Sequence, residues 1–143
     1  MKDSRAGAMG IVVVVLVILT KYAALSAMSL GTLFQALFFM PLAGRCAILL
    51  TMASLPYARE EGGLGLLFYS GNSAKAAKIA FALLFSVTLF LAPRQLLPIF
   101  FSILGMNFLF NRWCKTKLGG ATGDTLGAVC ELTEMIVAVA LTA

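Results

Sequence analysis

Five long apolar stretches, separated by short polar segments, constrain this chain more than any other feature. They cover roughly residues 8–28, 33–55, 79–92, 96–110 and 124–141. About 20 predominantly apolar residues are needed to span a bilayer as a helix. Hydrophobic residues make up 61% of the 143 residues and charged residues only 12%, a balance that no soluble domain of this size needs. The sequence therefore predicts an all-α, polytopic transmembrane helix bundle of about five spanning helices, forming one domain over residues 1–143.

The second, third and fourth runs carry features that bear on their spans. Pro41 lies inside the second run, where a membrane helix tolerates proline if its neighbours satisfy the freed backbone groups. The third run reaches spanning length only by starting in the polar residues 74–78, and residues 93–95 then form a tight turn. The fourth run either extends through Asn111 and Trp113 or forms a shallower hairpin with the third.

The placement of basic residues predicts the topology. They collect before the first run, in the connection of residues 56–78 and in the connection before the last run, whereas Arg94 alone falls in a connection on the opposite side. With five spans, the three basic segments lie at one end, and the positive-inside rule places that end and the N-terminus in the cytoplasm. Because no basic stripe alternates with aromatic residues, the net charge of +5 indicates a lipid bilayer partner and no nucleic acid.

The residue inventory excludes several kinds of chemistry. The chain has no histidine, so His-containing zinc sites and Ser-His-Asp triads are excluded. Cys46, Cys114 and Cys130 are widely spaced and odd in number, which argues against a disulfide framework. The glycine-rich segment 119–125 lacks the spacing and the Gly-Lys-Ser/Thr ending of a P-loop.

Three acidic residues lie in or beside the last apolar run. Asp124, Glu131 and Glu134 share one helix face at about 100° per residue. A charged side chain at membrane depth costs about 2.5–3.5 kcal/mol on insertion scales, so such residues usually serve a function. We expect the three carboxylates to face inward and to be candidate catalytic residues, although Asp124 alternatively only caps the last helix.

Two basic residues also lie inside apolar runs. Lys21 either extends its ammonium group to the interface or faces a polar interior and meets one of the carboxylates. Arg45 follows Pro41 by one turn and needs a partner if it is buried, and we expect it in the interior of the bundle.

The polar segments at the basic end suit a phosphorylated ligand. Carboxylates are the oxygen ligands that Mg²⁺ prefers when it bridges substrate phosphates. Backbone N–H groups of Gly119, Gly120 and Gly123, at a helix start, could receive an anion. Basic side chains could bind phosphate oxygens, namely those of Arg5, Arg45, Arg59, Lys115 and Lys117. The alternative for residues 56–78 is a solvated loop with an amphipathic segment.

Several segments, taken in order, resemble one known family. They are KDSRAGAMG at residues 2–10, Lys21, PYAREEG at residues 56–62, GGATGDTLGA at residues 119–128, and then Glu131 and Glu134. This series resembles the C-terminal portion of the cobalamin synthases, which are adenosylcobinamide-GDP ribazoletransferases. The resemblance implies a Mg²⁺-dependent enzyme in the plasma membrane of a prokaryote. It would join adenosylcobinamide-GDP to α-ribazole or its 5′-phosphate, release GMP, and form adenosylcobalamin or its 5′-phosphate.

The resemblance also implies site positions. Asp124, Glu131 and Glu134 would line the catalytic site, with Asp124 assisting Mg²⁺. The implied substrate-binding residues are Asp3, Ser4, Arg5, Lys21, Arg45, Arg59, Gly119, Gly120, Thr122 and Gly123. Family members carry an upstream Asp-rich metal motif that residues 1–143 lack. We therefore expect a missing N-terminal portion or a partner chain to complete the metal site, and the isolated chain to be inactive.

Other classes of function stay open at this point. Lys21, Arg45, Glu131 and Glu134 could instead form the charged pathway of a membrane transport or binding subunit. A purely structural membrane subunit would leave these charges unexplained. An inactive fragment of the transferase is the remaining alternative.

Overall fold

The computed structural model describes residues 7–58, 69 and 72–142. Within these residues the chain forms five α-helices, each long and apolar enough to cross a membrane. They are α1 (Ala8–Ser26), α2 (Leu30–Ser54), α3 (Ser73–Leu91), α4 (Leu96–Leu118) and α5 (Gly123–Thr142), with the short 3₁₀ turn η2 (Pro93–Gln95) before α4. The predicted all-α bundle with five spanning helices is confirmed for this part of the chain.

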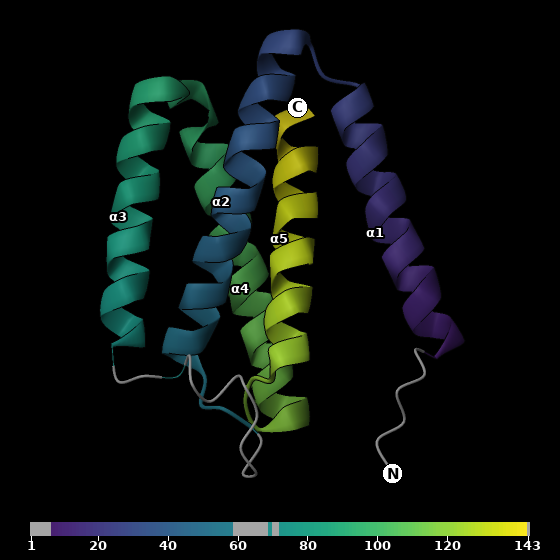
Figure 1. Cartoon of the computed structure of the whole chain (residues 1–143), viewed down its shortest axis with the longest axis vertical. Helices are drawn as coiled ribbons and strands as arrows, with labels where there is room; N and C mark the ends of the chain where they lie inside the picture. The colour runs from purple at the N-terminus through teal and green to yellow at the C-terminus, as the bar shows by residue number, and fades with distance from the viewer. Residues whose placement is uncertain (1–6, 59–68, 70–71, 143) are drawn as a thin grey trace.

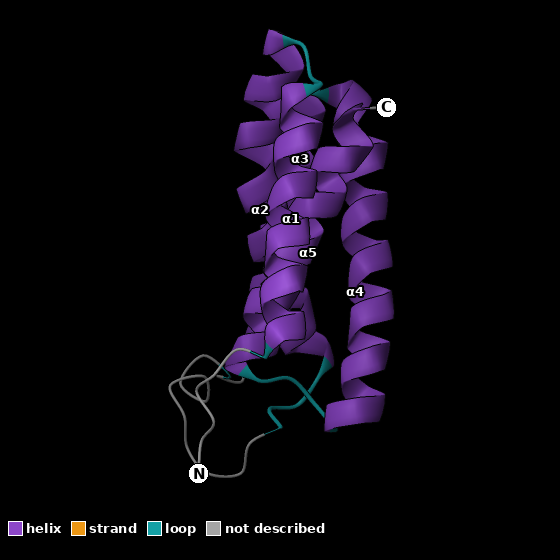
Figure 2. Ribbon diagram, turned by 90° about the vertical axis from the view of Figure 1, so that its right-hand side faces the viewer, coloured by secondary structure: helices purple, strands orange, loops and turns teal. Residues whose placement is uncertain are grey.

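The helices alternate in direction, and α2 and α5 lie at the centre of the bundle (Figure 1). α2 packs most extensively against α5 and also contacts α3 and α4, whereas α1 contacts α5. Figure 2 shows α4 on one side of the other helices. The main core includes Phe39, Ala43, Ile99, Ile103 and Val137, each almost inaccessible. Small residues such as Ala43 let membrane helices approach closely, which van der Waals packing in lipid requires.

The basic segments converge on one end, as the charge pattern predicts. The start of α1, the end of α2, the start of α3, the α4–α5 turn and the start of α5 all lie at the lower end in Figure 1. Lys75 and Lys78 in the first turns of α3, and Lys115 and Lys117 in the last turn of α4, carry positive charge at this end. The side of the membrane on which this end lies stays a prediction.

Some helix boundaries differ from those expected. α2 starts at Leu30 rather than at Leu33, because Ser29 caps it by accepting a weak hydrogen bond of 3.5 Å from the Thr32 amide. The uncharged link expected at residues 29–32 is therefore mostly helical. Pro41 does not interrupt α2, which runs unbroken through it.

The two alternatives for the fourth run are also decided. α4 extends through Asn111 and Trp113 to Leu118, so it has spanning length and the shallow hairpin is wrong. α3 begins at Ser73 and takes in residues 74–78, as expected. Trp113 is half exposed near the basic end, the position at which tryptophans anchor helices at an interface.

Candidate functional site

The α4–α5 turn is joined to the segment that follows α2. The Ala58 amide donates to the Ala121 carbonyl and the Ala121 amide donates to the Pro56 carbonyl, each at 2.9 Å. These bonds form an isolated parallel bridge between Tyr57 and Ala121. A Cβ atom on Gly120 would lie 2.4 Å from the Pro56 carbonyl oxygen, so only glycine fits this position. Two sequence blocks that carry the family resemblance therefore meet at the basic end of the bundle.

The same turn fixes the start of α5. Gly119 has φ of +72°, a left-handed conformation in which glycine ends α4 without steric cost. The Thr122 hydroxyl accepts from the Thr125 amide at 3.3 Å, and the Thr125 hydroxyl accepts from the Thr122 amide at 2.8 Å. Thr122 is thus the residue that caps α5, which corrects the alternative that Asp124 does so. Asp124 lies in the first turn of α5, where a carboxylate complements the helix dipole.

Aromatic side chains pack this junction against the helix ends. The rings of Tyr57 and Tyr69 lie 5.3 Å apart, and Tyr69 packs on a small core that includes Cys114 and Ala121. Burial raises the pKa of Tyr69, with smaller contributions from the neighbouring Tyr57 and Cys114. The Tyr69 hydroxyl is buried and has no hydrogen-bond partner among the residues that the structure describes.

An ion cluster joins α1 to α5 within the membrane-spanning part of the bundle. Lys21 Nζ lies 2.7 Å from Glu131 Oε2 and 2.8 Å from Glu134 Oε2. The side chains of Lys21 and Glu134 are 16% and 17% exposed, whereas that of Glu131 is 61% exposed. Lys21 therefore meets two carboxylates, and the alternative that it only extends to the interface is wrong.

The second oxygen of Glu134 faces α2. The Cys130 thiol donates to Glu134 Oε1 at 3.6 Å, and Arg45 Nη1 donates to Cys130 Sγ at 3.8 Å. Gly44 leaves room for these groups, because a Cβ there would lie 2.8 Å from Cys130 Sγ and 3.0 Å from Glu134 Oε1. Lys21, Glu131, Glu134, Cys130 and Arg45, which we call the ion cluster, thus connect α1, α5 and α2.

The expected inward orientation is wrong for part of this set. Asp124 and Glu131 are exposed in this chain, and so is Arg45 apart from its contact with Cys130. The buried face of α5 consists instead of small and apolar residues turned toward α2 and α4, namely Thr125, Leu126, Val129, Cys130, Thr133, Val137, Ala138 and Leu141. The acidic face of α5 lies beside its buried face, and Glu131 and Glu134 on it meet Lys21 of α1.

A cavity of about 500 Å³ lies between α1 and α5 next to the ion cluster. Its walls are apolar except for Glu131, and they include Val14, Val17, Gly127 and Ala128. α1 and α5 diverge toward the basic end in Figure 1, where the first turn of α5 carries Asp124. The exposed carboxylate of Glu131 is the charged group of this cavity.

The described residues do not by themselves fit a magnesium site. No group of three or more Asp, Glu, Cys or His side chains that could hold a metal occurs within residues 7–58, 69 and 72–142. Glu131 and Glu134 share one lysine, which already neutralises part of their charge. Asp124 lies two turns away, about 10 Å along α5 from Glu131.

Several predicted site residues cannot be placed. Asp3, Ser4, Arg5 and Arg59 lie outside the described residues. Gly119, Gly120, Thr122 and Gly123 all lie in the α4–α5 turn or at the start of α5, as expected.

Sequence reasoning missed two polar contacts inside the bundle. It passed over the role of Cys130, although this thiol lies one turn before Glu134. It also missed Thr51, whose fully buried hydroxyl lies 3.0 Å from the amide oxygens of both Asn107 and Asn111 and shares its one proton between them. Two asparagines one turn apart in an apolar run were the available signal, since membrane helices use such residues to hydrogen-bond to their neighbours.

Curated relatives of this chain share one description. An adenosylcobinamide-GDP ribazoletransferase of Acetivibrio thermocellus is 37% identical over 134 residues, which are 94% of this chain and 54% of the relative. One of Stutzerimonas stutzeri is 37% identical over 142 residues, 99% of this chain and 57% of the relative. One of Brevibacillus brevis is 32% identical over 141 residues, which are 99% of this chain and 57% of the relative.

The chain thus spans about half the length of the curated relatives that it matches. No solved structure matches it. The family profile described as cobalamin-5-phosphate synthase covers residues 1–142, nearly all of the sequence. The resemblance in the sequence blocks, the membrane helices that carry them and this match agree, and the chain belongs to the cobalamin-5-phosphate synthase family.

Proposed function

We propose that this chain forms part of a membrane transferase that joins adenosylcobinamide-GDP to α-ribazole or its 5′-phosphate. GMP leaves, and adenosylcobalamin or its 5′-phosphate forms. The observation that carries the proposal is the junction of residues 56–58 with the α4–α5 turn. It joins two of the blocks that resemble the family at one end of the bundle. The names of the relatives support the same reaction and favour it over a transport function.

The residues would divide into two sets. At the junction, the turn of Gly119 to Gly123 would bind phosphate groups together with Arg59, which directly follows the bridged segment. Deeper in the bundle, Lys21, Glu131 and Glu134 would hold α1 in place beside the cavity that admits a substrate. Arg45 would keep Glu134 in position through Cys130.

The metal is a separate proposal. Mg²⁺ would neutralise phosphate charge during the transfer, as divalent ions do in such reactions. The described residues alone do not fit a magnesium site. The metal ligands would therefore come from a further portion of the protein or from a partner chain, and would lie near Asp124 in the first turn of α5.

We also propose that the basic end faces the cytoplasm of a prokaryotic plasma membrane. Lys75, Lys78, Lys115 and Lys117 at this end support that orientation through the positive-inside rule. A membrane-impermeant thiol reagent applied to intact cells tests it, using Ser73→Cys at the basic end and Gln95→Cys at the other. We expect labelling of Gln95→Cys only, and the reverse pattern would refute the orientation.

A hybrid enzyme tests the transferase function. The part of the Acetivibrio thermocellus relative that this chain does not match would be fused to this chain, and GMP release would be measured with both substrates and Mg²⁺. We expect the hybrid to form product, and Asp124→Asn to reduce the rate at least tenfold, with Lys75→Gln as a surface control. A folded hybrid without product, beside an active relative, would refute the proposal.

A further inference from the structure

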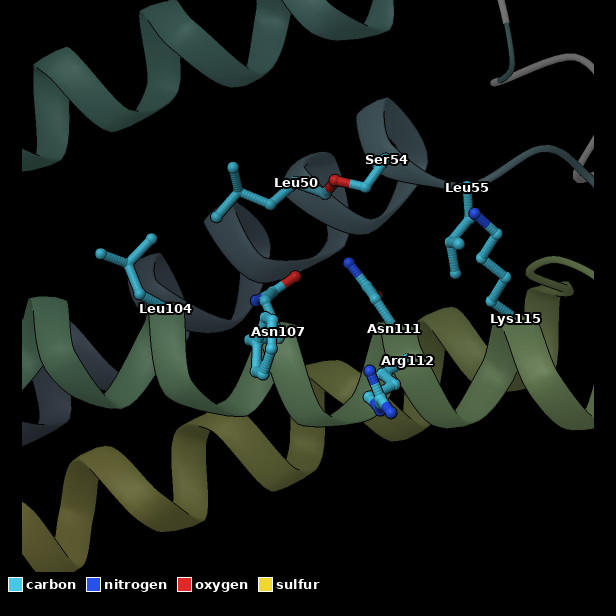
Figure 3. Close-up of a pocket in the computed structure, with 9 residues that line it drawn as sticks. Leu50, Ser54, Leu55, Leu104, Asn107, Asn111, Arg112 and Lys115 are labelled. Carbon is cyan, nitrogen blue, oxygen red and sulfur yellow. The ribbon is translucent and has the colours of Figure 1, made fainter.

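A second groove, distinct from the ion cluster and its cavity, lies between α2 and α4 (Figure 3). Its volume is about 440 Å³. The lining side chains come from the C-terminal end of α2, its cap residue included, and from residues 104–115 of α4, namely Leu50, Ser54, Leu55, Leu104, Asn107, Phe108, Asn111, Arg112 and Lys115. None of these residues is acidic.

The groove changes character along its length. Leu104, Phe108 and Leu50 form the walls at membrane depth, and Arg112 and Lys115 lie at the end where α4 terminates. Lys115 follows Leu104 by eleven positions, which is about 16 Å of helix rise. An apolar half therefore lies inside the bilayer and a cationic half lies near its surface.

Polar groups line the floor between the two halves. The buried Thr51 hydroxyl engages the Asn107 and Asn111 amide oxygens at 3.0 Å each. This holds the Asn111 side chain so that its nitrogen points from α4 toward the α2 wall, as Figure 3 shows. The amide N–H groups of Asn111 are thereby directed into the groove, near Ser54, where they can donate to an acceptor.

The cations of the groove have no partner of opposite charge in the described part of the chain. Arg112 and Lys115 are exposed, and neither forms an ion pair with any residue among 7–58, 69 and 72–142. Trp113, which follows Arg112, is half exposed and marks the level of the bilayer interface. Two cations at this level that have no acidic partner among the described residues attract an anion from the surface of the membrane.

We propose that the α2–α4 groove binds one anionic phospholipid. Its phosphate contacts Arg112, Lys115 and the Asn111 amide, and an acyl chain lies against Leu104, Phe108 and Leu50. Basic pockets between membrane helices on the cytoplasmic side recognise anionic headgroups in this way. A nucleotide would satisfy the cations but leave the apolar half of the groove without a ligand.

Quenching of Trp113 fluorescence tests the proposal, because this is the one tryptophan of the chain. The full chain is placed in phosphatidylcholine nanodiscs that contain small fractions of brominated phosphatidylglycerol or brominated phosphatidylcholine. We expect brominated phosphatidylglycerol to quench at about 30-fold lower fractions. That ratio corresponds to about 2 kcal/mol, from about 1 kcal/mol for each basic residue.

Matched variants decide the outcome. R112Q/K115Q is expected to lose the preference for phosphatidylglycerol, and K75Q/K78Q, which removes two cations from α3 at the same end, to retain it. Equal quenching by the two lipids in the unaltered chain would overturn the proposal, as would equal loss of preference in both double variants. Relief of the quenching by added GDP would assign the groove to a nucleotide instead.

Discussion

Gly44→Ala is expected to separate α2 from α5 at the ion cluster. The added Cβ would lie 2.8 Å from Cys130 Sγ and 3.0 Å from both Cγ and Oε1 of Glu134. Non-bonded atoms of this kind pack best at about 3.5–4.0 Å, so three contacts are too short at once. Glu134 could rotate away, but it would then give up its 2.8 Å bond with Lys21.

The cost follows from this geometry. Adding a methyl group to a well-packed interior typically costs about 1–3 kcal/mol. Gly105→Ala in α4 is the matched control, because a Cβ there has no neighbouring atom within 4 Å. Both substitutions also remove a glycine from a helix, which favours the helix by about 0.5–1 kcal/mol. We therefore expect Gly44→Ala to be less stable than Gly105→Ala by about 2 kcal/mol.

Reversible unfolding by SDS in mixed micelles, followed by circular dichroism, measures this difference. Cys130→Ala removes the nearest atom, so Gly44→Ala should cost less in that background, with a coupling free energy of about 1 kcal/mol. Equal stabilities of the Gly44→Ala and Gly105→Ala variants would show that α2 and α5 do not approach as closely as described. If Gly44→Ala lowers the free energy of unfolding by the same amount with and without Cys130→Ala, the thiol does not contribute to the clash.

Three further perturbations test the rest of the site. Gly120→Ala should release the bridged segment, and we expect amide hydrogen exchange at Ala58 to accelerate at least tenfold, with no change in the Gly127→Ala control. Thr122→Ala should lower the free energy of unfolding by about 1 kcal/mol through loss of the α5 cap, whereas Thr122→Ser should retain most of it. Lys21→Met should release α1 from α5, so we expect a broader distribution of the distances between spin labels on these two helices. Lys21→Arg should keep the distribution narrow. Equal distributions in the two variants would refute the role of the ion cluster.

The spans and the convergence of the polar ends could be predicted from sequence. Runs of apolar residues specify membrane helices directly, because every backbone group in lipid must be satisfied within its own segment. The alternation of short connections then places the basic segments at one end. The pairing of Lys21 with acids was predictable for a similar reason, since a charge inside a run needs a partner.

The rotation of the helices could not be predicted in the same way. The three acids share a face of α5, but the fully buried residues of this helix include Val129 and Thr133 instead. Glu131 and Glu134 meet Lys21 of α1, and Glu131 stays exposed. The sequence shows which residues share a face and gives no measure of which neighbour that face meets. The bridge between Tyr57 and Ala121 was equally hidden, since it joins backbone groups and depends on the absence of a side chain at Gly120.

The position of α1 shows why the ion cluster matters more than its few atoms suggest. Apart from Lys21, α1 is predominantly apolar all round, and nearly all of its side chains are exposed. In water such a helix would be driven onto the bundle, but lipid tails are as apolar as its valines and supply no comparable force. Specific contacts must therefore decide where α1 lies, and Lys21 supplies two at 2.7 and 2.8 Å. Ala24, Leu25 and, just after the helix, Met28 pack the other end of α1 on the main core, so the ion cluster is the polar contact that holds α1 beside the cavity. A ligand that competed for either carboxylate would therefore weaken the contact that holds one wall of its own site.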